Sequence, residues 1–286
     1  MKKIVIIFVF FMLLITSAIS GSAILESKNN DNTVSFLDDV PVWNIGDSWT
    51  YTIKDFTVDY QQEGQRIYFN GGINDFKLTV RDTSGPTYTV DFTGKLNCGY
   101  SIYLTTSNGL NLYLIGSMRQ ETTRLQGTVI FTKSNLNVRD ISGQISGITM
   151  AKIDPLPFAI PIPYKATIQG DLSTDFPLFN FPLSTNKFWE LPAMTIQMKM
   201  NVGGIFGFIQ IPITFTTQYG WTPLAFHCRG KQSVTVEAGT YNAWEIQSTF
   251  FDLFRYYYAP EIGTVVKIDA NMANGSVSAE LSSTNV

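Results

Sequence analysis

The residues best suited to chemistry are His227 and Cys228, the only histidine of the chain next to one of its two cysteines. An imidazole beside a thiol could bind a metal or form a nucleophile pair. A zinc site needs about four ligands, and no further ligand stands nearby at ligand spacing. Neighbouring residues of a strand also point to opposite faces. We therefore expect a structural role for His227, with no metal site and no cofactor.

Carboxylate pairs are the second kind of chemistry to consider, because two of them can hydrolyse a glycosidic bond without histidine. The only adjacent acids are Asp38 and Asp39, which fall in a polar stretch that nothing would hold in a catalytic geometry. Glu237, Glu245 and Glu261 are spread over expected turns and strands. No catalytic residue is predicted, and an extracellular carboxylate-dependent hydrolase is the least favoured function.

The two cysteines, Cys98 and Cys228, stand far apart in the chain. An even number of cysteines in an exported protein favours a disulfide, which would tie the first half of the chain to the second. Two separately buried thiols are the alternative, and the sequence leaves both open.

The amino-terminal residues have the order of a secretion signal. Met1-Lys2-Lys3 is followed by the apolar run Ile4–Ile15 and then by small residues. We expect a signal peptide over residues 1–23, cleaved after Ser20 or Ala23, and a secreted or cell-surface location. An uncleaved anchor is the alternative, but the run is short for a membrane-spanning helix. Residues 24–40 are polar and predict a flexible leader before a β-rich region over 41–286.

The charge of the chain argues against one class of partner. Removing Lys2 and Lys3 with the signal would change the formal charge from −3 to −5. An acidic chain with scattered lysines and arginines is a poor match for a phosphate backbone, so nucleic acid is not expected as a partner. Charged residues make up only 15% and aromatic residues 14% of the chain, which suits a body with much apolar surface to bury.

The hydrophobic pattern has a period of two and predicts strands. Its clearest stretch runs from Met194 to Phe215, interrupted by Gly203-Gly204. Two glycines between alternating runs favour a tight hairpin turn. In that register Val202 would face Ile205, and Met198 would face Ile209. The expected fold class is therefore all-β, a curved antiparallel sheet or open barrel built from hairpins, with little helix.

The proline-rich stretch Ile153–Tyr164 suggests a division of the β-rich region. Four prolines would break a regular ladder there. The stretch could join two related halves, 41–176 and 177–286, since Trp49 and Trp189 each lead a similar strand. A single continuous sheet with a proline-rich edge is the alternative.

The methionine-rich hairpin is the expected site for a ligand. Methionine is flexible and polarizable and suits adaptable apolar surfaces, and glycine across the sheet would leave room. A core packed on both sides would explain the same pattern. The residues of this expected apolar face are Met194, Met198, Met200, Ile209, Ile211 and Phe215.

Two carboxy-terminal segments resemble a known signature. Val234–Ile246 fits V-T-V-x-A-G-T-[FY]-x-A-x-x-I, and Tyr256–Lys267 fits YY-x-P-x-[VI]-G-x-V-V-K. The pair resembles a mostly uncharacterised group of secreted bacterial and archaeal β-rich domains. Gly239, Gly263 and Pro260 fit turn positions in it. Such domains are similar to the lipoprotein-carrier (LolA-like) open barrel, which holds lipid against its concave face.

Three functions follow as expectations. The first is an exported, non-enzymatic β-domain protein whose partner is a lipid or other apolar small molecule. The second is a structural or adhesive cell-envelope protein that contacts another envelope protein. The hydrolase described above is the third.

Overall fold

The structure is a computed structural model that describes residues 40–62, 65–105, 111–153, 157–190, 194–205, 209–219, 225–248, 254–272 and 275–286. The expected signal peptide and most of the expected leader lie outside these residues. Within them the protein is all-β and contains no helix, which confirms the predicted fold class. Accordingly, no described helix is long and apolar enough to cross a membrane.

The described residues form fifteen strands that belong to one sheet. The strands are β1 (Ser48–Gln62), β2 (Gln65–Asp82), β3 (Thr87–Thr105), β4 (Asn111–Met118), β5 (Arg124–Thr132), β6 (Val138–Ile153), β7 (Ile160–Leu172), β8 (Lys187–Glu190), β9 (Met194–Ile205), β10 (Ile209–Tyr219), β11 (Ala225–Val236), β12 (Gly239–Ser248), β13 (Phe254–Ala259), β14 (Thr264–Met272) and β15 (Gly275–Thr284). All pairings are antiparallel, so one sheet runs through both of the expected halves.

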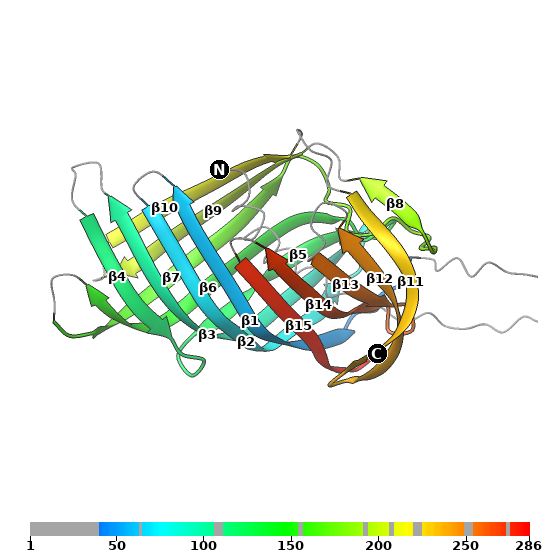
Figure 1. Cartoon of the computed structure of the whole chain (residues 1–286), viewed down its shortest axis with the longest axis horizontal. Helices are drawn as coiled ribbons and strands as arrows, with labels where there is room; N and C mark the ends of the chain where they lie inside the picture. Colours follow the sequence, from blue (N-terminus) through cyan, green and yellow to red (C-terminus); the bar gives the residue numbers. More distant parts are fainter. Residues whose placement is uncertain are drawn as a thin grey trace, which may run out of the picture.

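The strand order is β10-β9-β7-β6-β4-β3-β2-β1-β15-β14-β13-β12-β11-β8. Strands β4 and β5 both lie between β3 and β6. Strand β4 pairs with the second half of β3, and β5 pairs with the first half. The sheet curls strongly, and the distant β9 runs at a steep angle to β1 and β15 in front (Figure 1). It is not closed into a regular barrel, because β8 and β10 end its order among the described residues.

The methionine-rich hairpin exists, but its predicted turn is wrong. Gly203 and Gly204 lie inside β9. Strand β9 ends at Ile205, and β10 begins at Ile209. Met198 pairs with Phe215 instead of Ile209, and Val202 pairs with Ile211. The reason is that β9 also pairs with β7, where Gly203 meets Lys165, so the ladder continues through the glycines.

Strand β7 corrects the prediction that prolines break the ladder. Pro161 and Pro163 both lie inside this strand and pair in register with Met150 and Ile148 of β6. On its other side, the pairing of β7 with β9 begins at Lys165 within the described residues. The prolines therefore occupy the part of β7 that has one described neighbouring strand, where a missing N–H on the other side breaks no described ladder.

The two turns expected from the family signature are present. Val234–Ile246 spans the β11–β12 hairpin and Tyr256–Lys267 spans β13–β14. Gly239 has a φ of 147° and Gly263 a φ of 56°. Such positive values favour glycine.

One face of the sheet, called the inner face here, carries the main core. Trp49, Leu78 and Phe92 are fully buried on it. Segments outside the strands cover it. Trp43 packs on Tyr88 with ring centroids 4.5 Å apart. Residues 173–186 cross from β7 to β8, and the Tyr256 hydroxyl donates a 2.6 Å hydrogen bond to the carbonyl of Leu178 within them.

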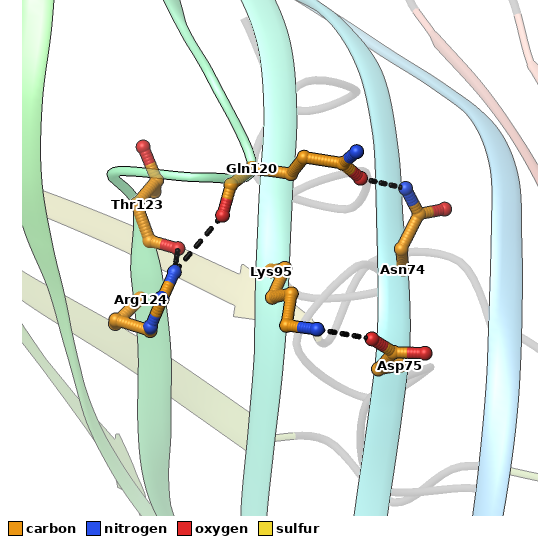
Figure 2. A network of polar contacts seen from close by, with 6 residues as sticks. All are labelled: Asn74, Asp75, Lys95, Gln120, Thr123 and Arg124. Carbon is orange, nitrogen blue, oxygen red and sulfur yellow. Dashed lines mark hydrogen bonds and ion pairs between the residues drawn. The ribbon is translucent and has the colours of Figure 1, made fainter.

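A line of irregularities crosses the long strands. The β1–β2 ladder shifts register between Ile53 and Phe56, and the β2–β3 ladder shifts between Asn74 and Lys77. Residues 119–123 separate β4 from β5 at the same level. Figure 2 shows how the line is held together: the Asn74 amide donates to the side chain of Gln120, and Lys95 pairs with Asp75 at 2.6 Å. Asp75 has a φ of 51°, as a bulged residue can adopt.

Candidate apolar site at the long-strand end

The inner face extends beyond the strands of the carboxy-terminal region. Strand β15 pairs with β1 only as far as Phe56, opposite Val277. Among the described residues, Thr57 to Gln62 of β1 pair with β2 and with no other strand. Figure 1 shows β1 and β2 continuing past the end of β15. The neighbouring strands β3, β4, β6 and β7 are in register with this extension, and together these strand ends form what we call the long-strand end.

A second, smaller hydrophobic cluster lies on the inner face of the long-strand end, and Phe69, Ile102 and Met118 pack against both this cluster and the main core. The buried members of the second cluster are Tyr100, Leu114, Ala151 and Ile162. Partly buried apolar side chains surround them, namely Phe69, Ile102, Met118 and Ile160. The cluster thus combines buried apolar side chains with partly exposed ones.

The register explains why these side chains share one face. Val58, Phe69 and Tyr100 pair across β1, β2 and β3. The same row continues through Gly116 and Ala151, on β4 and β6. Directly paired residues lie on the same side of a sheet. The row therefore crosses five strands without a charged residue.

Glycine makes room for an aromatic ring in this row. A Cβ atom on Gly116 would lie 2.4 Å from the hydroxyl oxygen of Tyr100, so the tyrosine ring lies over the glycine. The same arrangement recurs elsewhere on the inner face, where the ring of Phe92 covers Gly127 of β5 and Gly143 of β6. Rings that fill the space over glycine let a sheet curve without leaving voids.

Few polar groups enter the cluster, and each of them has a partner. Thr149 donates from Oγ1 to the carbonyl of Ser117 at 2.8 Å, so Tyr100 donates its hydroxyl hydrogen to Thr149 Oγ1 at 2.9 Å. Tyr164 donates to Thr123 Oγ1 at 3.3 Å. Burial raises the pKa of Tyr100, and that of Tyr164 to about 12, so both phenols stay neutral. The site offers apolar contact with fixed, uncharged hydroxyls.

The two cysteines are separate thiols in the structure, each buried. Cys98 lies on β3, in the row beside Tyr100, and Cys228 lies on β11. Burial raises the pKa of the Cys98 thiol to about 12. The thiolate is the reactive form of cysteine, so Cys98 adds an uncharged, unreactive surface to the inner face.

The apolar residues expected to bind a ligand lie elsewhere in the sheet. Met194, Met198 and Met200 are on β9, and Ile209, Ile211 and Phe215 are on β10. Register places Met198 opposite Gly170 and Met200 opposite Ile168 of β7. The structure describes only the backbone of these two strands, so the expectation for their side chains stays a prediction.

His227 packs against an aromatic ring and lies near an amide side chain. Its ring stacks on Phe188 with centroids 4.0 Å apart and planes 9° from parallel. Its Nε2 lies 3.4 Å from the Asn186 side-chain oxygen. Burial, together with the nearby charge of Arg229, lowers the pKa of His227. Within the described part of the chain, no group of three or more histidine, cysteine or acidic side chains could hold a metal ion.

Two of the acids considered for catalysis, Glu245 and Glu261, are engaged in separate contacts. Glu245 accepts a hydrogen bond from Gln232 and lies 3.7 Å from Arg255. Glu261 accepts from the backbone N–H of Asn242, and Glu237 is exposed. Asp38 and Asp39 lie outside the described residues.

Comparisons with known proteins add no assignment: no family model, no curated protein sequence and no solved structure matches this chain.

The long-strand end was not predicted as a site from the sequence. Cys98, Tyr100 and Ile102 alternate with Gly99, Ser101 and Tyr103, which was a usable signal. The alternation alone marks a half-buried strand. What makes these residues a candidate site is that β15 stops short of them, and strand lengths on the far side of a sheet cannot be seen from the pattern.

Proposed function

We propose that the protein binds a lipid or another apolar small molecule on the inner face of its long-strand end. The observation that carries this proposal is the second hydrophobic cluster, with its partly buried Phe69, Ile102 and Met118. Binding sites for apolar ligands are lined mainly by hydrophobic and aromatic side chains with a few placed polar groups. The Tyr100–Thr149 pair supplies such groups.

The chemistry of the cluster favours binding over catalysis. The groups closest to a bound ligand would be a thiol and phenols whose pKa values burial has raised, and these are poor acids, bases or nucleophiles at neutral pH. Export to the cell surface, predicted from residues 1–23, would put such a binding protein where membrane lipids are accessible.

Replacing Ile102 with glutamate tests the proposal. A carboxylate on the inner face would be desolvated by a bound fatty acyl chain, so affinity for cis-parinaric acid should fall at least about tenfold. The measurement is a fluorescence titration of the purified protein at constant pH and salt.

The adjacent Tyr103 provides the matched control, because it is exposed on the opposite face of β3. Tyr103→Glu introduces the same charge one residue away and should change the affinity less than twofold. Equal affinities of the wild type and both variants, or no saturable binding by any of them, would rule the proposal out. Circular dichroism of each variant checks that the fold is intact.

A further inference from the structure

The outer face of the long-strand end is apolar as well. Five large hydrophobic side chains are exposed there, between 36% and 48% of their surface: Tyr103, Tyr113, Ile115, Ile148 and Met150. We call these five residues the rim patch. Phe158, exposed at 59%, follows in the connection from β6 to β7.

Register brings the rim patch together on β3, β4 and β6, and two prolines of β7 lie beside it. Tyr103 of β3 pairs directly with Tyr113 of β4. Ser117, two positions beyond Ile115 on β4, pairs with Met150 of β6. Met150 and Ile148 then pair with Pro161 and Pro163 of β7, and both prolines are exposed. Contiguous apolar surface of this kind marks an interaction site on a soluble protein.

The charges around the rim patch are basic. Lys152 pairs with Ile115, and Lys165 follows the two prolines on β7; both lysines are exposed. Arg66, which pairs with Tyr103, is neutralised by Asp59 at 2.8 Å. Among the described residues neither lysine forms an ion pair, so Lys152 beside Ile115 and Lys165 beyond the prolines add positive charge to the patch in a chain whose formal charge is −3. Such a surface complements an anionic partner.

The same strand ends are apolar on both faces, since the partly buried Phe69, Ile102 and Ile160 line the inner side. A protein partner would require only the outer patch. A lipid bilayer would account for apolar residues on both faces. Strand ends that enter the bilayer interface bring the outer face and the ligand-binding inner face into contact with acyl chains together. Tyrosine and lysine are suited to that depth, with apolar bodies and polar tips.

We infer that the long-strand end docks on anionic lipid bilayers through the rim patch, with Lys152 and Lys165 at the headgroups. This inference rests on the proposed function, for which docking is the step that lets an apolar ligand pass between the membrane and the inner face.

The test is sedimentation with vesicles of phosphatidylcholine containing 30% phosphatidylglycerol, using the full chain. An Ile115→Glu/Met150→Glu variant should lower the partition coefficient at least about tenfold. Thr93→Glu/Gln126→Glu is the matched control: it adds the same charge to paired, exposed positions of the same outer face, away from the rim. It should bind within twofold of the wild type. Lys152→Gln should weaken binding about fivefold, and less so in high salt.

Two further measurements separate the possible failures. The rim variant should keep its affinity for cis-parinaric acid, so lost vesicle binding with retained ligand binding supports the inference independently. Vesicle binding equal in the rim and control variants would overturn it. So would a dimer, found by sedimentation equilibrium, that only the rim variant abolishes, because the patch would then bind a second copy.

Discussion

Replacing Gly127 with valine is expected to lower the free energy of unfolding by about 3 kcal/mol or to prevent folding altogether. A Cβ atom at this position would lie 2.2 Å from the carbonyl oxygen of Ser142 and 2.3 Å from the ring of Phe92. The first contact is with the backbone of the paired strand β6, which cannot move without breaking the ladder. Urea unfolding followed by circular dichroism measures the loss.

Gly99 supplies the control on the neighbouring strand. Its Cβ would meet only the Asn70 carbonyl oxygen, at 4.0 Å. Gly99→Ala should therefore leave stability unchanged or raise it by about 0.5–1 kcal/mol, since glycine is the less favourable residue inside a strand. A Gly127→Val protein as stable as the wild type would show that Phe92 does not lie over this glycine.

Replacing Trp49 with alanine is expected to cost about 3–5 kcal/mol, as for other fully buried tryptophans. Trp49 is fully buried in the main core and packs against Trp43, with ring centroids 5.9 Å apart. Loss of the indole would leave a cavity where the amino-terminal segment meets the sheet. Thermal and urea unfolding of the two proteins give the difference.

Two further variants separate packing from polarity at this position. Within the described part of the chain, the indole N–H of Trp49 has no hydrogen-bond partner. Trp49→Phe should therefore cost clearly less free energy of unfolding than Trp49→Ala. Phenylalanine fills much of the space of the indole, and no hydrogen bond is lost. Ile45→Ala, at a residue that is 67% exposed, should stay within about 0.5 kcal/mol of the wild type. A Trp49→Ala protein of wild-type stability would contradict this description of the core.

The sequence predicts the individual strands well, because the alternation of apolar and polar residues in a strand is a local pattern. Phe76, Leu78 and Val80 alternate as expected, and all three are buried. The residues around Gly239 and Gly263 form the predicted turns because their backbone angles require glycine. Gly203 shows the limit. Two glycines in β9 looked like a turn, but a ladder to β7 fixed them within a strand, and pairing between distant strands has no local signature.

The candidate site was beyond prediction for the same reason. Ile102 and Leu114 could be assigned to half-buried strands from their neighbours alone. That they belong to a second cluster depends on where β15 stops relative to β1, at the pair Phe56–Val277. This relation joins residues from opposite ends of the chain, and it is set by the tertiary register.

Photo-crosslinking with a diazirine fatty acid tests whether a lipid binds at the long-strand end, because mass spectrometry then locates the ligand on the chain. Crosslinks are expected in peptides that contain Ile102, Leu114 and Ile160, all suppressed by excess unlabelled oleic acid. Peptides from β13 and β14, whose inner side is packed in the main core, should remain unlabelled. Labelling that unlabelled oleic acid does not reduce, or competed labelling confined to strands outside the long-strand end, would contradict the proposed binding.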